Sequence, residues 1–442
     1  MTFTNEKLKR MIIPLFIECF LVLLVGMVDT FMVSYAGETA VSGVSLVNSL
    51  NTVFINLFQA LASGGAVVVS QYIGKGDRDK GSEASSQLLM FSTLFSLLLM
   101  AGVLAGGRPM LNVLYGAVEP AVMDACVIYL WITTLSYPFM AIYNAGSSVL
   151  RSMGRTKETM YISILANIIN LVGNYIGIFI MHAGVAGVAW PTTISRIFQA
   201  VVITIICWHK ENEVHYVLKN IFEWNGDLLK KIFNIAVPNG VENAIFNMVK
   251  VALSSVVAGF GTVQTTAHGV AQTIWGISNV SSQAMGPVFV TVIGQYMGAG
   301  ETGKAEHAFW KLLKLTTLIS ILWNAVMIFS TPFLMNYYQI SAQAKQYVIL
   351  IVAIHDVFNA FFMPFSGPLG NGLRAAGDVR FTMIWAIVAS VGGRLALTYI
   401  LACGFGMGVI GVTIAMVSDW VIRGIIYTVR LKGGIWKTKK VI

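Results

Sequence analysis

Residues 11–33 read MIIPLFIECFLVLLVGMVDTFMV, a continuous apolar stretch that carries two carboxylates, Glu18 and Asp29. An acidic side chain near the middle of a bilayer costs about 2.5–3.5 kcal/mol on insertion scales, so such a residue usually faces a cavity or an ion pathway. A spacing of eleven residues places the two acids within about 20° of each other on a helix and about 16 Å apart along its axis. The stretch therefore predicts a membrane-spanning helix with acidic groups at two depths on one face.

The composition extends this prediction to the whole chain. Of the 442 residues, 56% are hydrophobic and only 11% are charged, whereas about 25% of the residues of a soluble domain are charged. Apolar runs long enough to cross a bilayer recur twelve times, which predicts an all-α polytopic membrane protein. They cover residues 11–33, 46–72, 86–106, 122–149, 159–181, 186–208, 232–259, 267–297, 309–330, 344–372, 381–402 and 408–429.

The basic residues indicate the orientation of these spans. The net charge is +9, but its distribution argues for membrane topology rather than for a nucleic-acid partner. With the N-terminus in the cytosol, the cytosolic segments hold 23 of the 29 Lys and Arg residues, and the outer loops hold two, Arg108 and Lys345. Cytoplasmic loops are enriched in this way. We therefore expect a multi-pass protein of the plasma (inner) membrane with both termini cytosolic.

The chain contains an internal repeat. Residues 71–84, QYIGKGDRDKGSEA, align with residues 295–308, QYMGAGETGKAEHA, at an offset of 224. Further along, LRSMGRTKETM (150–160) matches LRAAGDVRFTM (373–383) with a shift of one residue. The offset of 224 also relates three more pairs: Pro14 and Pro238, Glu18 and Glu242, and Gly37 and Gly261. Ordered matches of this kind indicate two copies of one structural unit.

The repeat predicts the domain organisation. Each half holds six spans, an even number, so both halves begin and end on the same side of the membrane. Repeats of this kind are related by a pseudo-twofold axis along the membrane normal, and in transporters the substrate site lies where they meet. We expect a six-helix lobe over 1–208, a charged, amphipathic cytosolic linker helix over 209–231, and a second six-helix lobe over 232–442.

Several of these motifs resemble the multidrug and toxic compound extrusion (MATE) family. They are the PxxxE opening of the first span with the later VDTFMVS, the QYIGKG and QYMGAG segments, LRAAGD, and GVAWPTTIS. The resemblance covers essentially the whole chain. It implies twelve helices in two lobes around a cavity, and export of organic cations or other amphipathic toxic compounds in exchange for H⁺ or Na⁺. No cofactor is implied, and we expect a functional monomer whose partners are the lipid bilayer and small organic cations.

Comparison of the two halves separates shared polar residues from unshared ones. Glu18 has a counterpart in Glu242, whereas Asp29 falls opposite Leu253. Three other oxygen-bearing residues of the first half also lack an identical counterpart: Asn170, Asn174 and Thr192 fall opposite Arg394, Thr398 and Met416. Asn170 and Asn174 are one helical turn apart and share a face. The four unshared residues therefore form a candidate set confined to the first half.

Oxygen ligands suit a hard cation such as Na⁺, and a buried carboxylate suits a proton. In the family, positions resembling Asp29, Asn170, Asn174 and Thr192 bind the coupling cation. Some members carry a second carboxylate where this chain has Asn174, and its absence here favours H⁺ over Na⁺. The alternative for Asn170 and Asn174 is interhelical hydrogen bonding worth about 0.6 kcal/mol each.

Glu242 and Glu18 are candidates for the substrate cavity, because a carboxylate lining a cavity attracts cationic compounds. Other functions are less well supported. A flippase for a lipid-linked saccharide or a lipid shares the broad fold but often has a more cationic cavity. GISN at 276–279 and GKGD at 74–77 only superficially resemble protease motifs. Neither a metalloprotease motif nor a phosphate-binding motif occurs, so we expect a transporter and not an enzyme.

Overall fold

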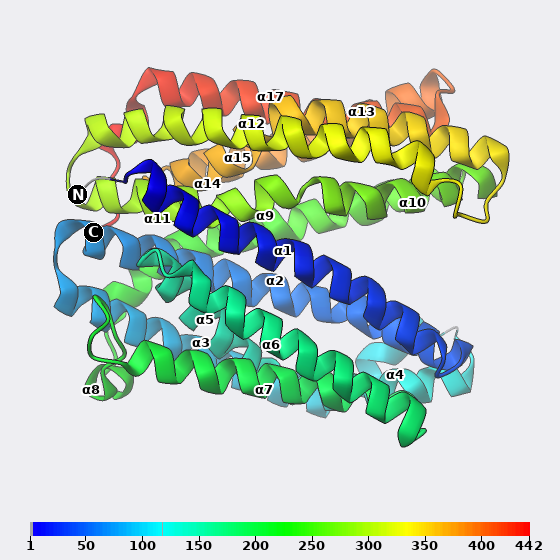
Figure 1. Cartoon of the computed structure of the whole chain (residues 1–442), viewed down its shortest axis with the longest axis horizontal. Helices are drawn as coiled ribbons and strands as arrows, with labels where there is room; N and C mark the ends of the chain where they lie inside the picture. Colours follow the sequence, from blue (N-terminus) through cyan, green and yellow to red (C-terminus); the bar gives the residue numbers. More distant parts are fainter. Residues whose placement is uncertain (1–2, 117) are drawn as a thin grey trace. The chain divides into compact units, whose positions relative to one another are not determined.

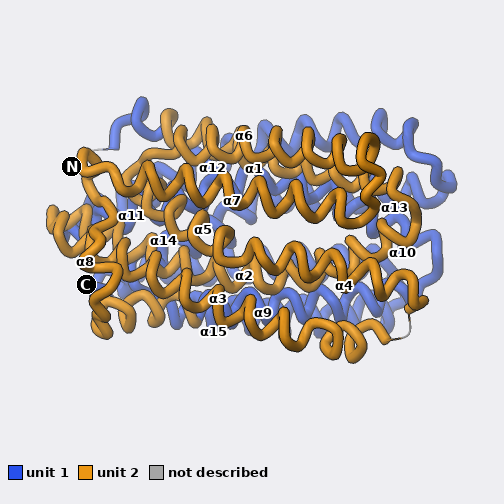
Figure 2. Tube along the Cα trace, turned by 90° about the horizontal axis from the view of Figure 1, so that it is seen from below, with its two compact units in different colours: residues 1–8, 238–442 blue, residues 9–237 orange. Residues whose placement is uncertain are grey.

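The computed structural model describes residues 3–116 and 118–442, and all regular secondary structure in this part of the chain is helical. The chain divides into two compact units, shown in different colours in Figure 2. One unit comprises Lys9–Val237 and is called the N-unit here. The other comprises Pro238–Ile442 together with residues 3–8 and is called the C-unit. The fold is that of an all-α membrane protein, as the sequence predicts.

Long helices dominate the N-unit, and Figure 1 shows them in blue to green. The π-helical segment η1 continues α6. The elements are α1 (Asn5–Ser34), α2 (Glu38–Lys75), α3 (Arg78–Tyr115), α4 (Pro120–Thr134), α5 (Tyr137–Ser152), α6 (Thr156–Tyr175), η1 (Ile176–Ile180), α7 (Ala186–Trp208) and α8 (Leu218–Phe222).

The C-unit has a similar series of helices, and α9 begins shortly before the boundary between the units. Its elements are α9 (Gly226–Ala258), α10 (Thr262–Ser278), α11 (Val280–Gly298), α12 (Thr302–Leu334), α13 (Ala342–Ser366), α14 (Pro368–Ala375), α15 (Val379–Ile387), η2 (Val388–Leu395), α16 (Ala396–Thr398), η3 (Tyr399–Gly404), α17 (Gly408–Gly433) and η4 (Ile435–Thr438). The helix α13 packs against both α12 and α17.

Each of the twelve predicted spans falls on helical structure, and three of them are interrupted, one of these being 344–372, where α13 ends at Ser366 and α14 begins at Pro368. In the described residues, ten helical stretches are long and apolar enough to cross a membrane, and α4 and α5 together form an eleventh that is bent by 47°. The remaining prediction, 267–297, falls on α10 and α11, which meet at Asn279. Hydropathy predicts where the chain is apolar, but it does not register these breaks.

The internal repeat is visible in the backbone. Gly37 and Gly261, matched by the offset of 224, stand directly before α2 and α10. Their φ angles are 101° and 90°, values that side-chain-bearing residues rarely adopt. Pro14 and Pro238 likewise lie inside α1 and α9. The matched residues therefore serve the same structural purpose in both units.

The segment 209–231 differs from the predicted linker helix. Its only complete helix is α8, which is five residues long, and α9 begins at Gly226. Asn225 Oδ1 accepts hydrogen bonds from the backbone N–H groups of Asp227 and Leu228 at 3.1 Å, so it starts a new helix there. Val214 and Tyr216 are fully buried. Burial of these two apolar residues holds the segment against the N-unit and prevents a continuous amphipathic helix.

Candidate cation site

The helices α6 and α7 approach closely at the candidate site. A Cβ on Gly177 would lie 2.1 Å from the carbonyl oxygen of Gly187, and a Cβ on Gly173 would lie 2.6 Å from Pro191 Cβ. Glycine at these positions lets the two backbones come together. One residue after Asn174, α6 ends at Tyr175 and the π-helical η1 begins, a feature that is frequent at functional sites.

This packing brings the four unshared residues of the N-unit together. Asn174 Nδ2 donates a hydrogen bond to Asp29 Oδ1 at 3.0 Å and another to Asn170 Oδ1 at 3.2 Å. Asn170 Nδ2 lies 3.1 Å from Thr192 Oγ1 and donates to it. The site thus joins α1, α6 and α7 through one chain of polar contacts.

The amide of Asn170 has two possible orientations. In the second, its nitrogen donates to both oxygens of Asp29 at 3.0 Å, and its oxygen accepts from Thr192 Oγ1 at 3.1 Å. Which orientation is present depends on the hydrogen-bond network, because amide oxygen and nitrogen are nearly identical in size. In both orientations Asp29 receives amide hydrogen bonds from α6.

Burial makes this cluster unusual. Asn174 is fully buried and Asn170 is 7% exposed, while Asp29 and Thr192 are half-buried. Asn174 Oδ1 has no hydrogen-bond donor among the described residues. A buried oxygen without a donor costs free energy, and it is an acceptor that a proton donor or a hard cation would satisfy. The cluster therefore has the oxygen chemistry expected for H⁺ or Na⁺.

Two further polar residues lie near this site, and the sequence indicates only one of them. Arg196 lies one turn after Thr192 on α7, and its Nη1 donates to Ser136 Oγ at 2.7 Å. Tyr129 of α4 is buried, donates to Asn48 Oδ1 at 3.2 Å, and interacts electrostatically with Asp29 and Arg196. Arg196 was visible as a charge within a span, but nothing in the sequence distinguishes Tyr129 from other aromatic residues.

Glu18 lies apart from this cluster in a buried ion pair. Its Oε1 is 2.8 Å from Arg151 Nη2 at the end of α5. Thr159 Oγ1 donates to Glu18 Oε2 at 3.1 Å, and the Tyr143 hydroxyl donates to Oε1 at 3.4 Å. The charge of the Glu18 carboxylate is therefore balanced by Arg151, and both of its oxygens accept hydrogen bonds.

Glu242 forms the equivalent pair in the C-unit. Arg374 Nη2 lies 2.6 Å from both carboxylate oxygens of Glu242, and Arg374 Nη1 donates to Asn371 Oδ1 at 2.8 Å. Arg151 and Arg374 each follow the leucine of the repeated LR motif. The repeat therefore conserves an acid and its arginine partner within this one chain. Whether Glu242 or Glu18 contacts substrate stays a prediction.

The C-unit has a different chemistry where the N-unit has its polar cluster. Arg394, opposite Asn170, is buried, and its guanidinium carbon lies 5.1 Å from the centre of the Phe246 ring. Thr398, opposite Asn174, donates to the Arg394 carbonyl oxygen at 2.8 Å. Leu253, opposite Asp29, is buried. At these three positions the C-unit therefore carries a guanidinium, a hydroxyl and an aliphatic side chain in place of the two amides and the carboxylate of the N-unit.

The fold is that of a multi-pass helical membrane protein built from two copies of one unit. A model of the MatE family matches residues 14–176 and again residues 238–400. The chain therefore belongs to the MATE family of transporters. The two matched segments lie one in each half of the repeat.

Individual relatives are similar over nearly their whole length. The uncharacterised transporter YisQ of Bacillus subtilis is 27% identical over 430 residues, covering 96% of this chain and 94% of that protein. The probable multidrug resistance protein NorM of Thermotoga maritima is 22% identical over 450 residues, covering 99% and 94%. A crystal structure of MATE in complex with MaD3S has a TM-score of 0.90 at 19% identity, with coverage of 97% and 96%. This last likeness shows the fold.

Proposed function

We propose that this protein is a secondary antiporter that exports cationic, amphipathic compounds in exchange for a cation bound at Asp29. The observation that carries the proposal is the buried cluster of Asp29 with Asn170, Asn174 and Thr192. Family membership and the similarity to the probable multidrug resistance protein NorM of Thermotoga maritima support multidrug export. We place the protein in the plasma membrane as a functional monomer with cytosolic termini.

We propose H⁺ as the coupling ion, with Na⁺ as the alternative. The cluster contains one carboxylate, and Asn174 already donates to it, so a bound Na⁺ would have to displace an amide donor from Asp29. A proton needs a single acceptor oxygen. The Na⁺ alternative is supported by the number of oxygens that the four side chains offer.

Binding of a proton would alter the connection between α1 and α6. The ionised carboxylate of Asp29 accepts hydrogen bonds only, whereas its protonated form also donates one. In the ionised state Asn174 Nδ2 donates to Asp29. In the protonated state Asp29 would instead donate to Asn174 Oδ1, which has no donor in the present arrangement. We propose that this exchange shifts α1 relative to α6 and weakens substrate binding while the transporter alternates between inward-open and outward-open states.

The driving force depends on the charge of the substrate. One elementary charge crossing about 100 mV releases about 2.3 kcal/mol, which corresponds to about a 50-fold gradient of a neutral solute. Exchange of one H⁺ for a monovalent organic cation moves no net charge, so the pH gradient drives it and supplies about 1.4 kcal/mol for each pH unit.

The decisive experiment measures efflux of a cationic dye from proteoliposomes under separately imposed pH and Na⁺ gradients. We expect Asp29→Asn to reduce gradient-driven efflux at least tenfold, because the amide cannot take up a proton. The matched control is Asp124→Asn, since Asp124 is an exposed acid whose nearest basic group, Arg108 Nη2, is 3.8 Å away. Unchanged coupled efflux in Asp29→Asn would refute the proposal.

The two gradients distinguish the coupling ions. Efflux driven by the pH gradient alone supports H⁺, and efflux that requires the Na⁺ gradient supports Na⁺. In either case Asn174→Ala is expected to weaken coupling, because it removes the donor to Asp29 and the unsatisfied oxygen together. Wild-type coupling in Asn174→Ala would assign Asn174 to helix packing instead.

A further inference from the structure

The first turns of α12 carry a basic stripe that transport by the N-unit cluster does not use. Lys304, His307, Lys311 and Lys314 follow one another at intervals of three, four and three residues, a spacing that places them on one face of a helix. Lys304, His307 and Lys314 are exposed and Lys311 is half-buried. The apolar part of α12 begins directly after them, so the stripe lies at the edge of a candidate membrane span.

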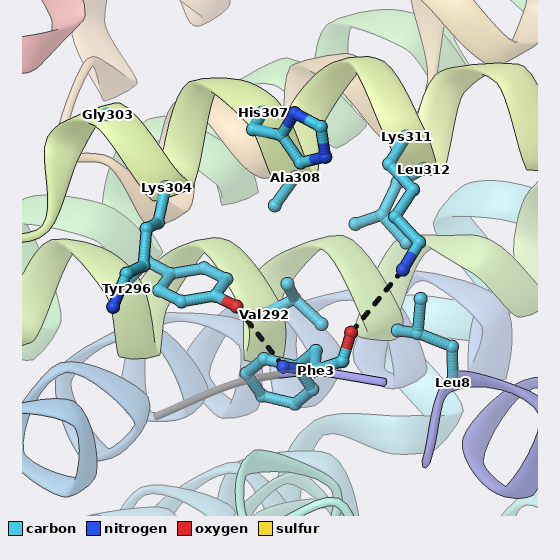
Figure 3. Close-up of a pocket in the computed structure, with 10 residues that line it drawn as sticks. All are labelled: Phe3, Leu8, Val292, Tyr296, Gly303, Lys304, His307, Ala308, Lys311 and Leu312. Carbon is cyan, nitrogen blue, oxygen red and sulfur yellow. Dashed lines mark hydrogen bonds between the residues drawn. The ribbon is translucent and has the colours of Figure 1, made fainter. Parts of the chain in front are cut away.

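A cavity of about 320 Å³ lies beside this stripe, within the C-unit. Figure 3 shows Lys304, His307 and Lys311 on α12 facing Tyr296 and Val292 of α11, with Phe3 across the gap. Leu8, Ala308 and Leu312 add apolar lining. The cavity thus combines a basic side with an apolar side, and its size is in the range of small-ligand sites.

The cavity is closed on one side by the beginning of the chain. The Phe3 backbone N–H donates to the Tyr296 hydroxyl at 3.2 Å, and Lys311 Nζ donates to the Phe3 carbonyl oxygen at 3.4 Å. Lys7 Nζ lies 4.6 Å from the centre of the Phe3 ring. These contacts hold two ammonium groups near the cavity without neutralising either of them.

The two acids near the stripe are paired, Glu301 with Lys304 of the stripe and Glu306 with a lysine outside it. Glu301 accepts a hydrogen bond from Lys304 Nζ at 2.7 Å, which lowers the pKa of Glu301. Glu306 pairs with Lys437 at 2.6 Å. Lys311 has no ion pair with any residue in the described part of the chain. The cavity therefore keeps an excess of positive charge.

The equivalent position in the N-unit is occupied by the chain itself. Under the offset of 224, His307 and Lys311 correspond to Glu83 and Gln87 of α3. Gln87 Nε2 donates to the carbonyl oxygen of Asn220 at 2.6 Å, and Asn225 Nδ2 donates to Glu83 Oε1 at 2.6 Å. In the N-unit, the acid and the amide at these positions bind the segment after α7. In the C-unit, the equivalent positions carry basic residues beside a cavity.

We propose that the cavity between α11 and α12 binds an anionic phosphate group, with Lys311 and His307 as its principal donors and Lys304 and Lys314 as flanking charges. Two sources share this chemistry, the headgroup of an anionic phospholipid and free phosphate. The apolar lining and the position at the edge of the span favour the lipid, because basic pockets beside membrane helices bind such headgroups.

The test uses the purified full-length protein in detergent and native mass spectrometry with dioctanoyl phosphatidylglycerol as the probe. Dioctanoyl phosphatidylcholine, which has no net charge, is the lipid control, and inorganic phosphate is the competitor. We expect phosphatidylglycerol to be retained in preference to phosphatidylcholine. We expect Lys311→Gln to lower this retention about fivefold, and His307→Gln/Lys311→Gln to lower it further.

Two control variants separate charge from folding. Lys311→Arg keeps the charge and should retain the lipid, whereas Lys80→Gln removes the lysine at the position equivalent to Lys304 in the N-unit and should leave binding unchanged. Competition by inorganic phosphate at concentrations similar to those of the lipid would identify free phosphate as the ligand. Equal retention of the two lipids, or equal retention of phosphatidylglycerol by wild type and the double variant, overturns the proposal.

Discussion

Asp29 could be singled out from the sequence because the repeat supplies an internal reference. An acid that recurs in both halves, such as Glu18 with Glu242, has a purpose common to both units, and an acid that occurs once does not. The structure places Asp29 in contact with Asn174 and, through it, with Asn170 and Thr192. The structure therefore brings together residues that the sequence comparison grouped, and their role as the coupling site stays a proposal.

The partners of Glu18 and Glu242 were not predictable in the same way. Arg151 and Arg374 stand in the matched LR motif, but they are separated from their acids by more than a hundred residues. Pairing at such a separation depends on how α1 meets α5 and how α9 meets α14, which residue periodicity does not specify. The pairs are a consequence of packing.

We predict that replacing one member of the Glu242–Arg374 ion pair destabilises the protein more than replacing both. Glu242→Gln leaves Arg374 partly buried without its counter-charge, which costs about 3–5 kcal/mol. Glu242→Gln/Arg374→Gln removes both charges, so its loss of stability should be smaller than the sum of the two single losses. Thermal unfolding of the four proteins in detergent measures this coupling.

The same variants test the substrate role predicted for Glu242. If the carboxylate attracts cationic substrate directly, both Glu242→Gln and the double variant bind a cationic dye more weakly than wild type does. Wild-type affinity in the double variant would confine Glu242 to its ion pair. Glu18→Gln/Arg151→Gln is the matched change in the N-unit.

At the scale of elements, apolar periodicity located the helices but not their interruptions. The bend between α4 and α5, the meeting of α10 and α11 at Asn279, and the π-helical η1 all lie inside apolar runs. Such breaks are stabilised by neighbouring helices. Segment 209–231 shows the converse, because its charges suggested a helix and its two buried residues, Val214 and Tyr216, hold it against the N-unit instead.

We predict that the close approach of α6 and α7 is required for the cation site. In Gly177→Ala the added Cβ would lie 2.1 Å from the backbone oxygen of Gly187, so the helices must separate at a cost of about 1–3 kcal/mol. Separation would draw Thr192 away from Asn170, so we expect a lower unfolding temperature together with weaker coupled efflux. Gly106→Ala is the control, because its Cβ meets nothing within 4 Å. Wild-type stability and coupling in Gly177→Ala would contradict this account of the site.

At the scale of the whole molecule, the repeat explains how one unit could acquire a cation cluster while the other did not. Both units keep the glycines that stand before α2 and α10, the prolines within α1 and α9, and the matched ion pairs in which Glu18 and Glu242 each bind an arginine. These shared features maintain the fold. The unshared residues, Asp29 against Leu253 and Asn170 against Arg394, are free to differ because the shared ones already stabilise each unit.

The even number of spans and the distribution of basic residues predict that both ends of the chain lie in the cytosol. In a variant without native cysteines, Asp124→Cys and Lys439→Cys each introduce a thiol at an exposed position, one at the outer end of the predicted span 122–149 and one near the C-terminus. We expect a membrane-impermeant maleimide to label Asp124→Cys in intact cells and Lys439→Cys only after permeabilisation, because basic segments stay on the cytosolic side. Labelling of Lys439→Cys in intact cells would require an odd number of crossings or the reverse orientation. The reverse orientation would place the basic stripe of α12 at the outer surface, so the labelling of the two variants together indicates which leaflet could supply an anionic lipid to the cavity beside Lys311.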